Sequence, residues 1–210
     1  MRRIAILIYS PLALMLLLTG CMTTRTVEPL AYYTLNPQIS VEPGQETSAT
    51  LGIRPLMSAR PYNLAMAFQR DDHVLSYRAY DQWAEQPSAV LTRAIRDSLL
   101  ASNRFADVGL ATEMSRPDYL LTGEVLKFHE QISADQNTAE LAVRIEIRKA
   151  RDVELLLAET FQRVVPISAS TADATAYNTR EAFAVAMNSA IEELAVELGA
   201  RIAELTIEVD

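Results

Sequence analysis

Apolar and polar residues alternate along residues 139–149, and this period of two predicts a β-strand with one buried and one solvated face. The inward set is Leu141, Val143, Ile145 and Ile147, and the outward set is Ala142, Arg144, Glu146 and Arg148. The flanking stretches Tyr119–Gln131 and Val153–Val165 predict two more long strands. Because no helix pattern separates the three strands, they are expected to pair antiparallel.

Two other segments repeat apolar residues at the 3.6-residue period of a helix. The first begins at Pro87, since proline is tolerated at the first helical position, and ends at Ser102 and Asn103. Its predicted buried face is Val90, Leu91, Ala94, Ile95, Ser98 and Leu99. The second runs from about Asn178 to Leu205, and Asn178 with Glu181 forms a variant of the capping box. Its apolar stripe is Phe183, Met187, Ala190, Ile191, Leu194, Leu198 and Ile202.

The shorter elements complete a single domain. Strands are predicted at 32–35, 51–53 and 105–108, and a hairpin at 64–70 and 74–77 whose turn is Asp71, Asp72 and His73. The second helix has an acidic polar face, whereas membrane-surface helices are usually basic, so its stripe is expected to pack on the sheet. The predicted fold is α+β, with a mostly antiparallel mixed sheet and two main helices packed on one face.

Residues 1–20 have the pattern of an export signal. Arg2 and Arg3 precede an apolar run from Ile4 to Leu18, interrupted only by residues 9–11, and small residues follow before Cys21. The run is about 15 residues long, fewer than the roughly 20 that a helix needs to cross a membrane. A cleaved signal is therefore favoured over a permanent transmembrane anchor.

The motif at the end of this signal, Leu18-Thr19-Gly20-Cys21, resembles the lipobox of bacterial lipoproteins. In that class, processing attaches a diacylglycerol to the cysteine thiol, cuts before the cysteine and acylates the new amine. Cys21 is the only cysteine in the chain, so no disulfide can form within it. The alternative is an ordinary secreted protein with a chance cysteine beside its cleavage site.

Residues 21–30 are expected to form the lipidated tether of a domain that spans residues 31–210. The nine residues after Cys21 are polar, Thr-rich and contain Pro29, and they extend at most roughly 30 Å. The domain is therefore expected to lie close to the bilayer. Sorting rules for lipoproteins place a chain with Met22, rather than aspartate, at the second mature position at the periplasmic face of the outer membrane.

The charge balance disfavours some partners. The chain has 19 Lys and Arg against 27 Asp and Glu, and loss of Arg2 and Arg3 with the signal leaves 17 against 27. An acidic domain is not expected to bind nucleic acid or to adsorb on anionic head groups. Membrane contact would then come from the acyl chains or from an apolar surface.

No motif for catalysis or for a cofactor stands out. The chain lacks a G-x-S-x-G nucleophile motif and a glycine-rich phosphate loop, and no cysteine follows Cys21. Its two histidines, His73 in a predicted turn and His129 near the end of a long strand, lack the spacing of metal ligands. The prediction is a protein that is not an enzyme, with no catalytic residues, no metal and no cofactor.

Three stretches in order resemble the ABC-type transport auxiliary lipoproteins, the family that includes the lipoprotein of the paraquat-inducible system. They are Ala31-Tyr32-Tyr33-Thr34-Leu35, Tyr80-Asp81-Gln82-Trp83-Ala84-Glu85-Gln86-Pro87 and Pro117-Asp118-Tyr119-Leu120-Leu121-Thr122-Gly123-Glu124. The resemblance spans essentially all of the chain behind the signal. It implies a non-enzymatic auxiliary component that acts with a mammalian-cell-entry (MCE) domain protein and, through it, an ABC permease and ATPase. Such systems move phospholipids or other hydrophobic compounds between two membranes.

Only Cys21 receives a defined chemical role from this resemblance. Trp83, Tyr32 and Tyr33 are candidate partner contacts, although Trp83 is favoured as a packing residue before the first helix and both tyrosines fit a core or edge strand. Self-association into a homo-oligomer is left open. Competing hypotheses are an assembly or pilot lipoprotein for another outer-membrane machine, a lipid-binding carrier with its own cavity, and a lipoprotein enzyme.

Overall fold

Three long antiparallel strands dominate the sheet. A computed structural model describes residues 29–207 apart from 61, 71–72, 153 and 169–175, and in it β7 (Tyr119–Gln131), β8 (Thr138–Lys149) and β9 (Leu155–Pro166) pair in order. The three predicted long strands and their antiparallel pairing are confirmed. The inward set of β8 is at most 1% exposed, and Ala142 on the opposite side is also buried.

Shorter strands extend this sheet along the free edge of β7. In the direction of the chain, β7 pairs in parallel first with β2 (Thr50–Ile53), then with β3 (Met57–Ser58) and last with β4 (Ala65–Gln69). The outer neighbour of β2 is β6 (Asp107–Leu110), also parallel. The 13 residues of β7 therefore separate two ends of the molecule by about 40 Å.

The end beyond β4 is a small lobe. There β5 (Leu75–Trp83) pairs antiparallel with β4, and β1 (Ala31–Tyr33) pairs in parallel with β5. The predicted hairpin is confirmed, and its residues Asp71 and Asp72 lie outside the described residues. The strand predicted to end at Tyr77 continues to Trp83. The pairing register of β4 with β5 shifts between Ala65 and Ala67, and this irregularity hides the alternation of apolar and polar residues beyond Tyr77.

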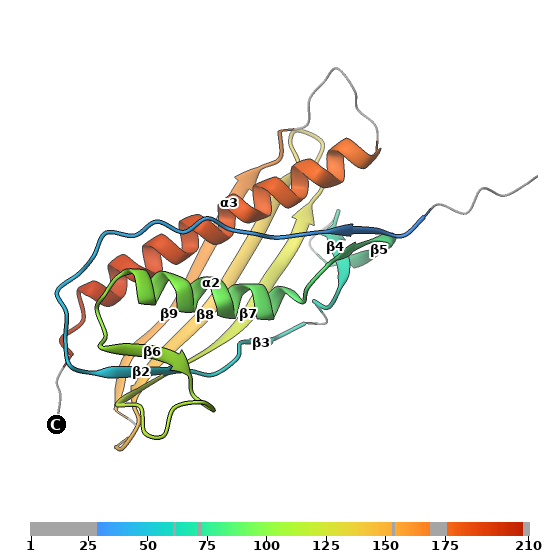
Figure 1. The fold of residues 1–210 in the computed structure, drawn as a ribbon. Coiled ribbons are helices and arrows are strands. Elements are labelled where there is room, and N and C mark those ends of the chain that lie inside the picture. The colour runs from blue at the N-terminus through green and yellow to red at the C-terminus, as the bar shows by residue number, and fades with distance from the viewer. Residues whose placement is uncertain (1–28, 61, 71–72, 153, 169–175, 208–210) are drawn as a thin grey trace, which may run out of the picture.

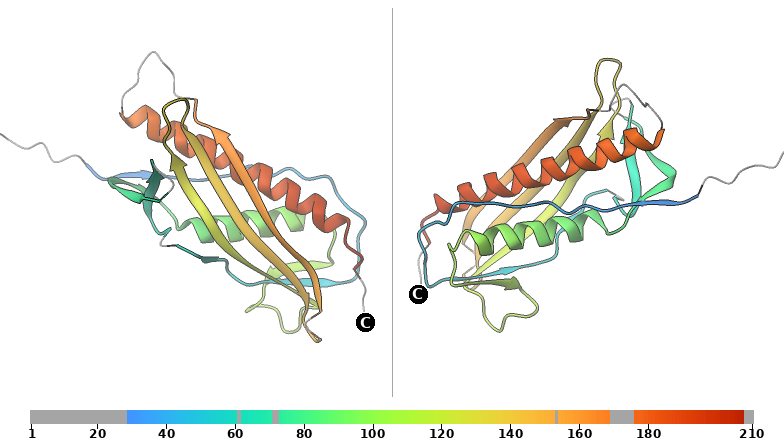
Figure 2. Two further views of the ribbon diagram at one scale, coloured as in Figure 1. Left: turned by 180° about the vertical axis from the view of Figure 1, so that it is seen from behind. Right: turned by 45° about the horizontal axis from the view of Figure 1, so that its top comes forward.

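Two helices cover one face of the sheet (Figures 1 and 2). The first, α2 (Pro87–Ala101), has proline in its first turn and ends before Asn103, whose φ of 49° stops a helix. The second, α3 (Ala176–Ala203), packs on β8, β9 and α2, and every residue of its predicted stripe is 0% exposed. Because α3 begins at Ala176, the capping box predicted at Asn178 is wrong.

The predicted fold class is confirmed: the described residues form one α+β domain, with a nine-stranded mixed open sheet and two helices on one face. No helix among them is long and apolar enough to cross a membrane. An extended segment after β1 runs over the helices (Figure 2, right). It is fixed where the Gln38 backbone N–H donates to Glu192 Oε1 of α3 at 2.6 Å and the Gly44 N–H donates to the Ser102 carbonyl at 2.7 Å.

Candidate functional site

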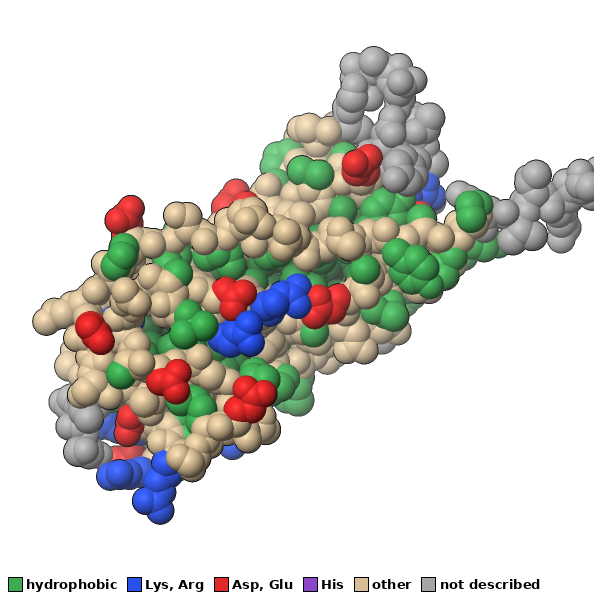
Figure 3. Space-filling model, in the orientation of Figure 1, with side chains coloured by type: hydrophobic (Ala, Val, Ile, Leu, Met, Phe, Trp, Pro, Cys, Tyr) green, Lys and Arg blue, Asp and Glu red, His purple; other side chains and the backbone are tan. Residues whose placement is uncertain are grey.

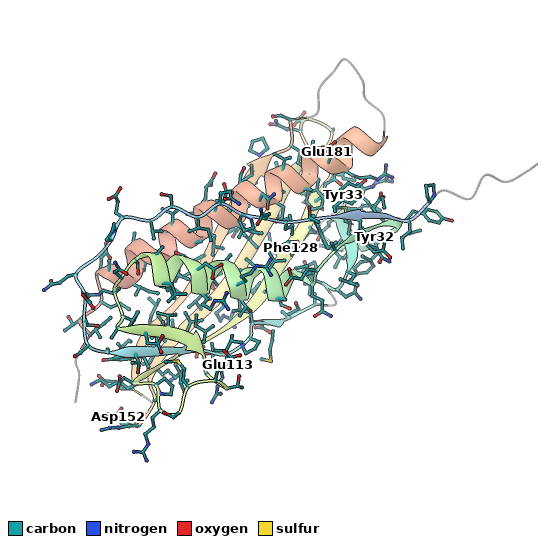
Figure 4. All side chains as sticks on the ribbon, viewed as in Figure 1. Tyr32, Tyr33, Glu113, Phe128, Asp152 and Glu181 are labelled. Carbon is teal, nitrogen blue, oxygen red and sulfur yellow. The ribbon has the colours of Figure 1, made fainter. Side chains whose placement is uncertain are left out.

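The lobe formed by β1, β4 and β5 receives the chain from the predicted tether, and we call it the tether-side lobe (residues 30–33, 64–70 and 73–83). Tyr32 projects outward there, whereas Tyr33 turns inward (Figure 4). The Tyr33 hydroxyl donates to Asp81 Oδ1 at 3.3 Å, and Arg180 of α3 lies 2.6 Å from Asp81 Oδ2. The buried Asp81 carboxylate therefore joins β1, β5 and the first turns of α3.

Trp83 lies in the core beneath this lobe. Its ring contacts Phe128 edge-on at a centroid distance of 5.6 Å and Phe183 at 5.4 Å, and its side chain is 1% exposed. These contacts join β5, β7 and α3. Trp83 is therefore too buried to contact a partner in this structure. Of the three candidate contact residues, Tyr32, Tyr33 and Trp83, only Tyr32 is exposed.

Exposed apolar side chains gather on the tether-side lobe. Six of the twelve large apolar side chains exposed in the described part of the chain belong to it, and Figure 3 shows apolar surface at this end. They are Leu30, Tyr32, Leu64, Val74, Tyr77 and Tyr80. Tyrosine side chains are favoured where an apolar region meets water, as at a membrane surface or a protein interface.

A small polar cavity of about 320 Å³ lies between this lobe and the long strands. It is lined by Arg60, Gln69, Lys127, His129, Gln131 and Glu140. His129 is 1% exposed, its Nδ1 lies 3.1 Å from the Tyr62 hydroxyl, and its Nε2 lies 3.9 Å from Glu140. Burial lowers the pKa of His129, an effect that the Glu140 carboxylate opposes and the charges of Lys127 and Arg60 reinforce.

This environment predicts that His129 makes folding stability depend on pH. The unfolded chain takes up a proton on His129 below about pH 6.5, whereas the folded chain resists it, so stability falls as the pH drops below that value. We expect His129→Gln to lose less unfolding free energy than the wild type between pH 7.5 and 5.0 in urea titrations. His73→Gln, at an exposed position, is the control and should follow the wild type. Equal losses in the wild type and His129→Gln would refute this account of His129.

A larger cavity is a cleft at the opposite end of the molecule, where β7 begins. Its volume is about 820 Å³, and it is partly open to solvent. The lining combines basic and apolar side chains with one carboxylate, and consists of Arg54, Pro55, Ala111, Thr112, Met114, Ser115, Arg116, Pro117, Asp118, Leu120, Ala150 and Arg151. We call it the arginine cleft. Basic side chains project at this end in Figure 3, close to Asp152 in Figure 4.

The wall of the arginine cleft is the loop between β6 and β7, and it is fixed at several points. The Ala111 N–H donates to the Ile53 carbonyl at 2.8 Å, and Asp118 Oδ2 accepts from the Thr50 N–H and hydroxyl at 2.9 and 2.8 Å. The loop also packs on Gly52, where an added Cβ would lie 2.9 Å from Pro117. Contacts within the protein therefore hold the wall of the cleft.

The arginine cleft was not predicted from the sequence. Its arginines lie far apart along the chain. The strand β6 ends level with Ile53, next to Arg54, and the loop that carries Arg116 returns from there to the start of β7. The sequence shows Arg54-Pro55 after one strand and Arg116-Pro117 before another, but not that this loop brings them to one cleft. Proline beside arginine fixes the backbone where a strand begins or ends.

Two further predictions concern chemistry. Cys21, the predicted lipidation site, lies outside the described residues. Among those that are described, no group of three or more His, Cys, Asp or Glu side chains is arranged to hold a metal ion.

Comparison with known proteins identifies the family. Residues 33–199 match the family model described as "ABC-type transport auxiliary lipoprotein component". The chain belongs to this family. The family resemblance drawn from the three motifs is thereby confirmed, and the arginine cleft and most of the tether-side lobe lie inside the matched region of this transport auxiliary lipoprotein.

Solved structures share the fold of the transport auxiliary lipoprotein. Protein XCC0632 from Xanthomonas campestris has a TM-score of 0.70 and 19% identity, over 82% of this chain and 95% of that one. Hypothetical protein CT253 from Chlamydia trachomatis has a TM-score of 0.51 and 12% identity, over 75% of this chain and 96% of that one. These identities establish the fold alone. No curated protein sequence matches the chain.

Proposed function

We propose that this lipoprotein is a non-enzymatic component of an MCE transport system that moves phospholipids or other hydrophobic compounds between two membranes. The family match supports a role beside an ABC-type transporter. The Leu18-Thr19-Gly20-Cys21 motif supports a lipid anchor, and Met22 supports the periplasmic face of the outer membrane. In this role the protein fixes the far end of the transport path to the outer membrane.

The observation that carries the proposal is the placement of two different surfaces at opposite ends of β7. The tether-side lobe holds the end of the tether and, among the described residues, half of the exposed large apolar side chains. The arginine cleft lies about 40 Å away, at the other end of the 13-residue strand. With nine residues from Met22 to Leu30 after the lipidated Cys21, the lobe stays near the bilayer and the cleft points into the periplasm.

An MCE-domain protein that spans the periplasm would meet the cleft end first. The lipoprotein would dock this partner there and, through it, act with the permease and ATPase in the inner membrane. The partner's surface would have to complement a mixed surface of arginine, proline and methionine side chains around the cleft. The tether-side lobe would remain against the outer membrane.

Copurification after crosslinking tests this proposal. Cells that produce a C-terminally tagged lipoprotein are treated with a membrane-permeable crosslinker, and the captured proteins are identified by mass spectrometry. We expect an MCE-domain protein among the captured proteins. Capture of a secretin or an outer-membrane barrel, with no MCE component, would overturn the proposal in favour of a pilot lipoprotein for another machine.

A further inference from the structure

We infer that the arginine cleft is a binding site for the phosphate-bearing end of an amphiphile, with guanidinium groups on the phosphate and the apolar lining under the adjacent hydrocarbon. The inference rests on the proposed function, because it names the class of molecule that the lipoprotein would receive. The ligand class follows from three observations on the cleft: its unpaired charges, its apolar lining and its fixed wall.

The first observation is that the cleft arginines have no acidic partner. Eight other arginines of the described chain pair with carboxylates, namely Arg78, Arg93, Arg96, Arg144, Arg148, Arg163, Arg180 and Arg201. Arg54, Arg116 and Arg151 pair with no described carboxylate, as is also true of Arg60, Arg70 and Arg104, but only these three line one cleft together. Unpaired arginines gathered in one cleft favour an anionic ligand, and the guanidinium fork matches phosphate oxygens.

The one carboxylate of the lining does not neutralise them. Asp118 Oδ2 accepts two hydrogen bonds from Thr50, which hold the side chain toward β2. The lining itself carries three positive charges and one negative charge in a protein of net charge −8, and Glu113 and Asp152 are exposed beside it. An excess of positive charge in the lining of an acidic protein favours an anion at this position.

The second observation is the apolar part of the lining. Pro55, Met114, Pro117 and Leu120 lie among the arginines, so a small inorganic anion would leave this surface uncovered. A ligand with hydrocarbon next to its charged group would cover both parts. The volume of about 820 Å³ lies within the roughly 300–1,000 Å³ of ordinary small-molecule sites. It holds a head group and the first carbons of its chains, not a whole phospholipid.

The third observation is that the loop carrying Met114 and Arg116 is held by contacts within the protein. Backbone hydrogen bonds fix Ala111 and Asp118 at the two ends of the loop, and Met114 packs against Gly109, where an added Cβ would lie 3.3 Å from its Cγ. Less ordering on binding means a smaller entropic cost. A fixed wall favours a ligand site over a loop that only happens to be basic.

Methionine methyl NMR tests the inference on the full lipidated protein. The protein, labelled with [methyl-¹³C]methionine, is held in phosphatidylcholine nanodiscs and titrated with dibutyroyl phosphatidylglycerol, a water-soluble phospholipid. We expect the Met114 signal to shift in a saturable way, while that of Met57, exposed on β3 and outside the cleft lining, stays in place. Glycerol 3-phosphate, which lacks the hydrocarbon, should bind at least about tenfold more weakly.

Matched variants assign the binding to the cleft charges. Arg116→Gln combined with Arg151→Gln is expected to weaken binding at least about tenfold, because charge-assisted hydrogen bonds from two guanidinium groups to the phosphate are lost. Arg70→Gln combined with Arg144→Gln makes the same charge change at exposed positions elsewhere and should bind like the wild type. An unchanged Met57 signal in every variant reports that the fold is intact.

Several results would overturn the inference. The first is a Met114 methyl signal that does not shift on titration. The second is an equal loss of phospholipid affinity in the two double variants, and the third is equal affinity for glycerol 3-phosphate and the phospholipid. Saturable binding of hexaglutamate in place of the phospholipid would assign the cleft to an acidic peptide. Because the titration uses the lipoprotein without its partner, its failure leaves the MCE proposal standing, and failure of the crosslinking experiment leaves the cleft chemistry standing.

Discussion

If the protein is anchored in the outer membrane as we propose, replacement of Cys21 by serine is expected to release it from that membrane. A serine hydroxyl does not accept the diacylglycerol that a lipobox cysteine receives, and each buried methylene of an acyl chain contributes about 0.8 kcal/mol to membrane attachment. The acidic domain has no electrostatic attraction to anionic head groups that would replace this energy. Fractionation of cells should move most of the protein out of the outer-membrane fraction.

The matched control is Ser40→Ala, a change far from the lipobox that leaves Cys21 in place. It should fractionate with the membrane like the wild type. Recovery of the Cys21→Ser protein in the outer membrane at the normal level would show that a partner or the tether-side lobe, rather than lipid, provides the attachment.

Trp83→Ala is expected to lower the free energy of unfolding by about 3–5 kcal/mol, the usual cost of truncating a fully buried large aromatic side chain. The indole ring packs against Phe128 and Phe183, so its loss opens a cavity where β5, β7 and α3 meet. Urea unfolding followed by circular dichroism measures the change. A domain of ordinary stability would be left close to unfolding.

The neighbouring Tyr32 provides the contrast. Its side chain is 61% exposed, so Tyr32→Ala should change the unfolding free energy by no more than about 0.5 kcal/mol. If the alanine variants at 83 and 32 had similar stability, Trp83 would not act as a core residue. A stable Trp83→Ala protein that lost its partner would restore Trp83 as a contact residue.

The strongest periodic signals in the sequence were sufficient to predict the main elements. The alternation of Leu141, Val143, Ile145 and Ile147 gave the buried face of β8, and the stripe from Phe183 to Ile202 gave the buried face of α3. Both elements are long, so a single position that departs from the pattern does not obscure the period. Their acidic or basic opposite faces also identified which side meets water.

The short strands could not be placed in the same way. β3 has only two residues, too few for a period, and β5 passes through an irregular stretch that interrupts its pairing with β4. Parallel pairing of β2 and β4 with β7 depends on contacts between residues far apart in sequence. The arginine cleft depends on that pairing, so it could be recognised only in three dimensions.

The central claim is that the cleft end of the lipoprotein faces the MCE partner while the tether-side lobe faces the membrane. A photo-crosslinking amino acid at Glu113 or at Asp152, both exposed at the cleft end (Figure 4), tests it against the same probe at Tyr32. After illumination of living cells, we predict that the MCE-domain protein is captured from Glu113 and Asp152 but not from Tyr32. Capture from Tyr32 alone would contradict this orientation.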